Sequence, residues 1–275
     1  MSHPALSLAY LTAPDLSPPD MLRAAQSVGY QYVGIRLLPA TPGGPVWPLM
    51  DDLALQSETR AAIKATGVKI YDIEIIRIGA NFHPKGHKRF LETCAALGAA
   101  AILIAGDDPD EQRLTANYAA FCEVAAPYKL TADIEFMPWT EIKNAAQATR
   151  IAVASGQANA GVLVDALHFA RSGSTLADVA AIPRHLLHYA QLCDAPAAIP
   201  ATMEGLLHAA RLERLLPGEG GIDLRGLLNA LPTDLPFSLE IPNEMRRTEL
   251  GSEEWGRQAL VATQTLLGAR KTSHT

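Results

Sequence analysis

The 275-residue sequence is poor in cysteine and in positive charge. Its three cysteines, Cys94, Cys122 and Cys193, include no CxxC pair, so we expect reduced thiols rather than a disulfide framework. Lysine and arginine number 23 against 29 aspartate and glutamate residues, which gives a net charge of −6. This balance disfavours nucleic acid as a partner, because a nucleic-acid surface usually carries a basic patch. It leaves a small anionic substrate open, since a local pair of arginines can bind one.

Long apolar runs are also missing. The longest run, 95–106, is too short to cross a bilayer and contains Gly98, so we expect no membrane partner. The first residues have no positively charged segment ahead of an apolar stretch, which a secretory signal would need. Together with the reduced thiols, these absences predict a cytoplasmic protein.

Eight short apolar segments alternate with longer, helix-like segments along the whole chain. The predicted strands cover 6–12, 32–38, 69–78, 100–106, 130–137, 161–169, 186–194 and 237–242. Nearly continuous apolar runs are typical of strands buried on both faces of a parallel sheet. Eight β-then-α units predict an α/β protein with one (β/α)8 TIM barrel over residues 1–269, followed by a flexible C-terminal tail at 270–275.

A doubly wound open sheet is the less favoured alternative. Such a fold would place a G-x-G-x-x-G motif after its first strand if it bound a dinucleotide, and none is present there.

Local signals predict where several helices begin and end. Ser17 followed by Pro18 is typical of a helix start, and Ser57 is a second candidate N-cap. Gly67 and Gly156 follow helix-like segments and predict their ends.

Polar residues interrupt the apolar strands at their carboxyl ends, where barrels carry their chemistry. Glu135, Asp165 and Glu240 lie at the ends of three such segments, and Gln191 lies near the end of a fourth. Three converging carboxylates repel one another unless a cation compensates them. An all-oxygen set suits Mn²⁺ or Mg²⁺ and is less suited to Zn²⁺ or Co²⁺. The pattern therefore predicts one divalent metal ion bound by these four side chains.

Further polar or aromatic residues follow other strands. Glu74 is a candidate substrate contact, or else the internal partner of Arg77 or Arg36. Asp194 is expected to orient neighbouring groups rather than to bind the metal directly. The remaining candidate substrate contacts are Arg77, Trp139 and Arg246.

Five segments resemble the xylose-isomerase-like TIM-barrel superfamily: "DIEFMPW", "GVLVDALHFARSG", "YAQLCDAP", "LLPGEGGIDL" and "FSLEIPN". The resemblance covers most of the chain and is strongest over 130–245. Its members include sugar isomerases and epimerases, inosose dehydratase, 3-dehydroshikimate dehydratase and endonuclease IV. It implies the same four metal ligands, and it places His168 where several relatives have a substrate-facing histidine.

Two positions depart from parts of this superfamily. Epimerase members usually have histidine where this chain has Gln191, whereas the 3-dehydroshikimate dehydratase branch has glutamine. The characteristic Phe-Arg segment of that branch is absent, and "EIIRIGANF" stands in its place. The resemblance therefore leaves an isomerase and a dehydratase open.

The resemblance implies an enzyme of carbohydrate metabolism that removes a proton α to a metal-bound carbonyl. Glu135 or Glu240 is the expected base of an isomerase or epimerase, and His168 is the expected proton carrier of a dehydratase. The expected substrate is a keto-sugar, a polyol or a cyclic keto acid, and a homo-oligomer is possible. A barrel that binds a ligand without catalysis is the alternative of a different class.

Overall fold

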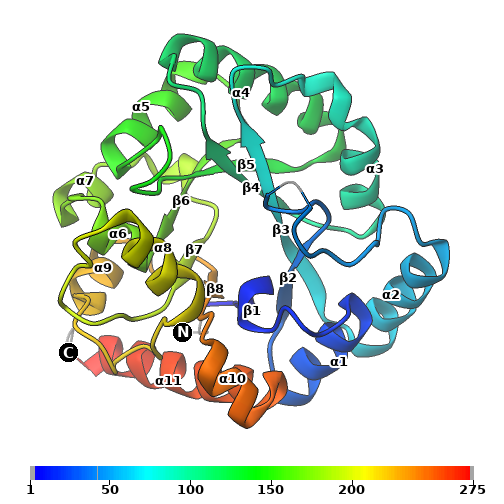
Figure 1. Ribbon diagram of the computed structural model, residues 1–275, viewed down its shortest axis with the longest axis vertical. Helices are drawn as coiled ribbons and strands as arrows, with labels where there is room; N and C mark the ends of the chain where they lie inside the picture. The colour runs from blue at the N-terminus through cyan, green and yellow to red at the C-terminus, as the bar shows by residue number, and fades with distance from the viewer. Residues whose placement is uncertain (1–3, 42, 273–275) are drawn as a thin grey trace.

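The computed structural model describes residues 4–41 and 43–272 of the chain. Eight parallel strands pair in sequence order, and β1 also pairs with β8, so that the sheet closes into a barrel (Figure 1). This confirms the predicted (β/α)8 TIM barrel. The strands are β1 (Leu6–Leu8), β2 (Tyr32–Arg36), β3 (Lys69–Ile78), β4 (Ala101–Gly106), β5 (Thr131–Glu135), β6 (Ala160–Asp165), β7 (Ala190–Leu192) and β8 (Phe237–Leu239).

Helices surround the barrel and connect its strands (Figure 1). The α-helices are α1 (Pro18–Val28), α2 (Leu53–Thr66), α3 (Lys88–Ala96), α4 (Glu111–Ala125), α5 (Ala145–Ser155), α6 (Ala166–Arg171), α7 (Leu176–Ala180), α8 (Met203–Leu212), α9 (Leu224–Ala230), α10 (Glu244–Leu250) and α11 (Ser252–Thr272). Short 3₁₀ helices are η1 (Tyr10–Thr12), η2 (Pro84–His87), η3 (Ala126–Tyr128) and η4 (Arg184–Leu186).

The predicted strands lie in the right places, but several are shorter than expected. The prediction for β3 agrees with the structure at both ends. The predicted strand 6–12 is wrong beyond Leu8, because the chain turns into η1. The predicted strand 161–169 stops at Asp165, whose side chain accepts a hydrogen bond from the backbone N–H of His168 and so caps α6.

Most of the predicted helix signals are confirmed. Ser17 caps α1 through the backbone N–H of Asp20, and Gly67 and Gly156 end their helices in the left-handed conformation. The expected N-cap at Ser57 is wrong, because α2 already begins after Asp52, whose carboxylate accepts a bond from a backbone N–H in the first turn.

The end of the chain is partly helical. Helix α11 continues to Thr272, so 270–272 belong to it, whereas 273–275 of the expected tail lie outside the described residues. Within the described part of the chain, no helix is both long enough and apolar enough to cross a membrane.

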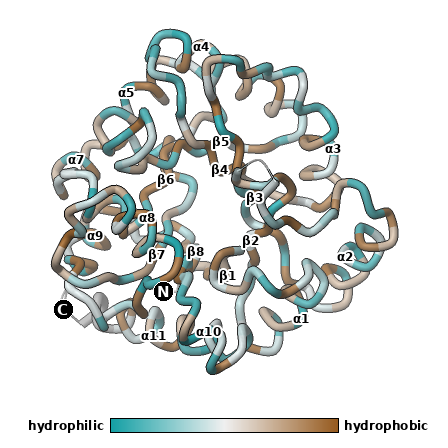
Figure 2. Tube along the Cα trace, viewed as in Figure 1, coloured by the Kyte–Doolittle hydropathy of each residue, from teal (hydrophilic) through white to brown (hydrophobic). Residues whose placement is uncertain are grey.

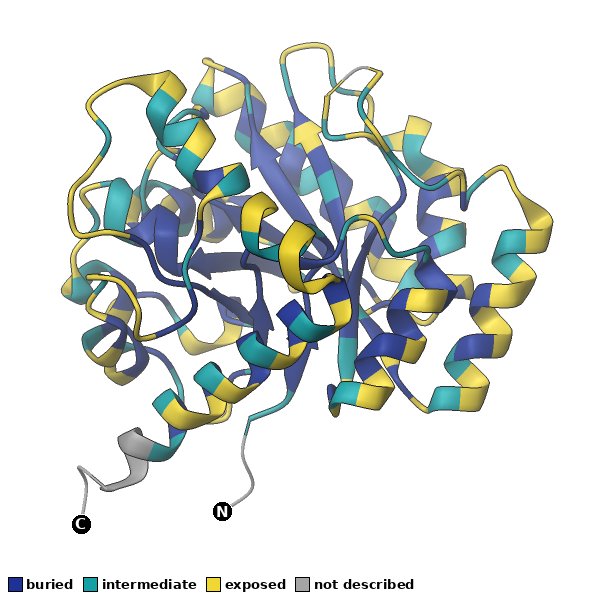
Figure 3. Ribbon diagram, turned by 60° about the horizontal axis from the view of Figure 1, so that its bottom comes forward, coloured by how far each residue is buried: buried dark blue, intermediate teal, exposed yellow. Residues whose placement is uncertain are grey.

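Side chains of the strands alternate between two cores. Outward-facing residues pack under the helices in the main core, and the hydrophobic segments of Figure 2 coincide largely with the buried strands of Figure 3. A second, small cluster inside the barrel contains Ala101, Leu103, Leu163 and Tyr189. Because residues beside outward-facing ones must point inward, the polar residues of the strands line the barrel axis.

We expect the Gly161→Ala substitution to destabilise the barrel. A Cβ atom at this position would lie 2.0 Å from Asp133 Oδ1 and 2.6 Å from His188 Nδ1 inside the barrel. Overpacking of this kind typically lowers the free energy of unfolding by about 1–3 kcal/mol. Urea unfolding measures the loss, and Gly79→Ala is the matched control because no heavy atom lies within 4 Å of its added methyl group. Equal unfolding midpoints for the two variants would contradict the expectation.

Candidate active site

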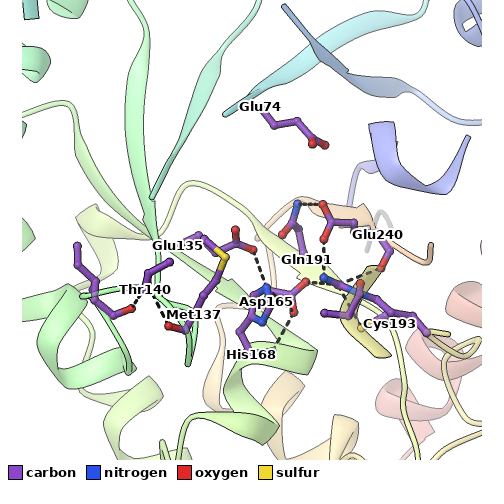
Figure 4. Close-up of polar contacts among 12 residues, drawn as sticks. Glu74, Glu135, Met137, Thr140, Asp165, His168, Gln191, Cys193 and Glu240 are labelled. Atoms are coloured by element: carbon purple, nitrogen blue, oxygen red, sulfur yellow. Dashed lines mark hydrogen bonds and ion pairs between the residues drawn. The ribbon is translucent and has the colours of Figure 1, made fainter. Parts of the chain in front are cut away.

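The four predicted metal ligands gather at one end of the barrel (Figure 4). Glu135 and Asp165 are the last residues of β5 and β6, Gln191 lies within β7, and Glu240 follows β8. All four are at most 4% exposed. The strand register places Asp165 beside Gln191, and the Gln191 amide donates to Glu240 Oε1 at 3.1 Å. Barrel topology therefore unites side chains that are far apart in the sequence.

The sequence analysis missed an arginine at the centre of this group. Arg214 is 2% exposed, and its guanidinium donates to Asp165 Oδ2 at 2.7 Å and lies 2.8 Å from Glu240 Oε2. The same group also donates to the backbone carbonyls of Ala210 and Glu240. Its one sequence signal is its place four residues before Gly218 in "LLPGEGG", which by itself does not point into a barrel.

The three carboxylates around Arg214 differ in the direction of their pKa shifts. Although burial acts to raise the pKa of Asp165, Arg214 and the nearby His168 hold that pKa below its ordinary value. Burial raises the pKa of Glu240 to about 8, even though Arg214 acts in the opposite direction. Burial, followed by the charges of Glu240 and Asp165, raises the pKa of Glu135 well above its ordinary value. One guanidinium therefore does not neutralise the three carboxylates.

The donor set fits a divalent cation. Glu135 Oε1 and Gln191 Oε1 are buried and accept no hydrogen bond from the described residues. Ligand atoms of Glu135, Asp165 and His168 lie within 4.8 Å of one another. Surplus negative charge and unpartnered oxygens both cost free energy when they are buried, and a bound cation would offset this cost. Glu240 lies outside that compact group and is joined to it by Gln191 and Arg214.

His168 faces the carboxylates from α6. Its Nε2 atom is 3.5 Å from Glu135 Oε1, and its Nδ1 atom has no hydrogen-bond partner among the described residues. The ring of Trp139 packs edge-on against it, with centroids 4.9 Å apart. Burial lowers the pKa of His168 to about 4, so the ring is neutral at pH 7 and can accept a proton.

The predicted substrate contact Glu74 belongs to a second buried ion pair. Its Oε2 atom lies 2.5 Å from a guanidinium nitrogen of Arg36, which also stacks over the ring of Tyr10 at 4.5 Å. The prediction left Arg36 and Arg77 open as partners, and the structure selects Arg36. Glu74 Oε1 has no hydrogen-bond partner within the described part of the chain, and Figure 4 shows the Glu74 carboxylate pointing toward the group of Gln191 and Glu240 without a contact to it.

Two predicted arginine contacts are engaged elsewhere. Arg77 donates two hydrogen bonds to Asp107, at 2.6 and 2.8 Å. It borders a surface cavity of about 530 Å³ along 77–87, whose lining includes none of the four predicted ligands. Arg246 lies 2.6 Å from Glu219 and packs over Trp255. The structure therefore does not bring Arg77 and Arg246 into contact with the buried carboxylates.

Asp194 organises the loop that carries Arg214. Its carboxylate accepts hydrogen bonds from the backbone N–H groups of Gly218, Gly220 and Ile222, at 2.9–3.1 Å. No hydrogen bond joins Asp194 to the four predicted ligands within the described residues. Asp194 therefore orients the backbone of "PGEGG", which is the kind of role expected for it.

Fold and site together define a (β/α)8 barrel with a buried, oxygen-rich site at the carboxyl ends of its strands. Residues 22–261 match the family model described as xylose isomerase-like TIM barrel, and the chain belongs to that family.

Three known proteins are similar to this chain. Inosose isomerase of Bacillus licheniformis is 26% identical over 263 residues, which cover 88% of this chain and 90% of that protein. 3-Dehydroshikimate dehydratase of Pseudomonas aeruginosa is 27% identical over 177 residues, and the match covers 61% of this chain but 27% of that protein. The solved structure titled IOLI protein with a binding zinc atom superposes with a TM-score of 0.78 at 20% identity, covering 97% of this chain and 99% of that one.

We expect Arg214→Met to lower the free energy of unfolding by about 3–5 kcal/mol in metal-free protein at pH 7, because it leaves Asp165 and Glu240 buried without their cation. Urea unfolding measures the change. The control Arg257→Met breaks an exposed pair with Glu254 and is expected to cost less than about 1 kcal/mol. A loss for Arg214→Met no larger than for the control would refute the role assigned to the guanidinium.

We expect His168 to make metal-free wild-type protein lose stability relative to His168→Gln as the pH falls from about 6.5 to about 4. Burial lowers the pKa of His168 from its ordinary value of 6.5 to about 4 in the folded protein, so the unfolded state binds a proton first in this interval. Urea unfolding of wild type and His168→Gln at pH 7 and pH 5 isolates the effect. The wild type should lose more stability than the variant, and NMR of the ring should show neutral His168 at pH 6. A ring protonated at pH 6 would contradict the assignment.

Proposed function

We propose that this protein is a divalent-metal-dependent isomerase or epimerase of small keto-sugars or keto-polyols. The observation that carries the proposal is the buried convergence of Glu135, Asp165, Gln191 and Glu240, with orphaned oxygens and surplus negative charge. Its similarity to inosose isomerase over nearly its whole length supports the same class of substrate.

The cation would be held by these four side chains, with Mn²⁺ or Mg²⁺ favoured by the oxygen-rich set. When bound, it supplies Lewis-acid polarisation of the substrate carbonyl.

Glu135 is the better placed of the two candidate bases. Its Oε1 atom has no hydrogen-bond partner in the described structure, whereas Gln191 and Arg214 engage both carboxylate oxygens of Glu240. Burial raises the pKa of Glu135, which favours a carboxyl group that can take up a proton. Glu135 removes the proton α to the carbonyl and leaves an enediolate. Return of the proton to the adjacent carbon, with a proton moved from the neighbouring hydroxyl to the former carbonyl oxygen, gives isomerisation. Epimerisation needs a second group that donates a proton to the opposite face, and Glu240, whose pKa is raised to about 8, is the candidate.

Arg214 holds Asp165 and Glu240 in place during this proton transfer. Its hydrogen bonds to backbone carbonyls fix the guanidinium itself, so the carboxylates are preorganised rather than drawn in by substrate. Trp139 packs against His168 and limits the positions that the imidazole can take.

A dehydratase is the second candidate, favoured by Gln191 and by the geometry of His168. The imidazole is neutral, 3.5 Å from Glu135, and carries an unpartnered Nδ1 atom. It can take up the α-proton and pass it to the β-hydroxyl, which then leaves as water. The matching segment of 3-dehydroshikimate dehydratase supports this reading over part of the chain. A ligand-binding barrel without catalysis explains the clustered buried carboxylates less well, because burying uncompensated charge costs free energy that only a functional requirement would offset.

The test is turnover of a panel of keto-sugars, keto-polyols and 3-dehydroshikimate with Mn²⁺ or Mg²⁺. For an isomerase or epimerase, we expect exchange of the α-hydrogen in deuterated water and a loss of kcat of at least about 100-fold in Glu135→Gln. Glu254→Gln on the exposed face of α11 is the matched control and should retain activity.

Other outcomes separate the alternatives. A new ultraviolet absorption from a conjugated acid, lost in His168→Gln, would favour the dehydratase. Absence of turnover, combined with no rise in melting temperature on adding Mn²⁺ or Mg²⁺, would reject both enzymes in favour of the non-catalytic barrel.

A further inference from the structure

One side of the barrel interior, next to the carboxylate cluster, carries buried polar atoms without hydrogen-bond partners in the described part of the chain. Five consecutive strands, in the order β7, β8, β1, β2 and β3, border this region. Four side chains there carry buried polar atoms without a hydrogen-bond partner in the described part of the chain: Ser7 Oγ, Asp72 Oδ1 and Oδ2, Tyr189 Oη and Ser238 Oγ. Each of these residues is at most 3% exposed. Orphaned buried oxygens in such number imply an occupant.

Strand alternation points these groups toward one another. Leu6 and Leu8 flank Ser7 in the outer core, and Phe237 and Leu239 flank Ser238 in the same way, so both serines face inward. Ser7 and Ser238 are also register partners on neighbouring strands. Tyr189 directly precedes β7 and belongs to the inner cluster.

A glycine of β2 lets the carboxylate of Asp72 lie against the inner side of that strand. Gly34 faces inward between Val33 and Ile35 of the outer core, and a Cβ atom there would lie 2.8 Å from Asp72 Oδ2. The carboxylate of Asp72 therefore occupies the place that a side chain at residue 34 would take, and it lies inside the barrel.

The charges of the barrel interior leave Asp72 uncompensated. Six buried carboxylates line the axis: Asp72, Glu74, Asp133, Glu135, Asp165 and Glu240. Arg36 pairs with Glu74, His188 pairs with Asp133, and Arg214 is shared by Asp165 and Glu240. A divalent ion at Glu135, Asp165 and Glu240 would balance the surplus there. Asp72 has no described cation beside it, and burial together with the neighbouring carboxylates raises its pKa well above the ordinary value. Ionised Asp72 is therefore costly to bury without a cation of its own.

We propose that this side of the barrel interior, here called the chamber, binds a monovalent metal cation, held by the carboxylate of Asp72 and the hydroxyl oxygens of Ser7 and Ser238, with Tyr189 at its edge. The donor set contains oxygen alone, which suits a hard cation and excludes an anion. One carboxylate supplies one negative charge, which matches a monovalent ion better than a divalent one. Protonation of Asp72 would remove the charge but leave the orphaned hydroxyls unsatisfied. The proposal does not depend on the reaction proposed above, but its charge balance rests on the divalent ion proposed there.

The test compares thermal unfolding in NaCl, KCl and choline chloride at equal ionic strength, with Mn²⁺ saturating throughout. We expect Na⁺ or K⁺ to raise the melting temperature in a saturable way, by about 5 °C relative to choline. Asp72→Asn should abolish the rise, and Ser238→Ala should increase the half-saturating cation concentration on the order of tenfold. Equal melting temperatures in the three salts would overturn the proposal, as would a full cation response in Asp72→Asn.

Thr263→Val is the matched control for the serine variant. Thr263 Oγ1 is also buried and without a partner in the described structure, but it lies in α11 outside the barrel. Its removal should leave the cation response unchanged, and an effect equal to that of Ser238→Ala would count against the chamber. Should Asp72→Asn fail to fold, crystals of the wild type grown in RbCl decide the matter. Anomalous density beside Asp72 is expected, and its absence from well-ordered crystals would reject the site.

Discussion

The carboxylate-rich end of the barrel depends on one buried guanidinium group. Arg214 contacts Asp165 at 2.7 Å and Glu240 at 2.8 Å, and it lies in the loop between β7 and β8. Without it, two carboxylates would face each other in a medium that solvates charge poorly. Asp194 in turn holds the "PGEGG" backbone that follows Arg214. The loop, the arginine and the carboxylates therefore form one connected electrostatic unit.

Closure of the sheet places this electrostatic unit inside a narrow barrel. Alternate residues of each strand pack under the helices, and the residues between them point to the axis, so that polar side chains from β1 to β8 share one narrow interior. The inner cluster around Leu103 and Leu163 makes one side of that interior apolar. The other side, from Tyr189 round to Asp72, carries orphaned oxygens. A barrel of this kind concentrates negative charge along its axis and is suited to holding cations there.

Membership of the xylose isomerase-like TIM barrel family agrees with this electrostatic picture. At Gln191 the site carries an amide rather than a charged or imidazole group. An amide donates and accepts at once, and here it donates to Glu240 and leaves its oxygen free. The amide oxygen of Gln191 therefore remains available as a ligand or hydrogen-bond acceptor, while the amide nitrogen holds Glu240 in place. Both proposed reactions can use this oxygen.

The sequence by itself determined the architecture and the four converging positions. Eight apolar runs separated by helices allow few folds, and a barrel places the ends of all eight strands at one rim. Glu135, Asp165 and Glu240 could be recognised because each breaks an apolar strand. Tertiary structure alone decided the ionic pairing: Arg214 and Arg36 enter the interior, whereas Arg77 and Arg246 pair at the surface with Asp107 and Glu219. The physical reason is that apolar periodicity is local in the chain, whereas partners of charged groups are set by loop paths and by the strength of electrostatics in a buried environment.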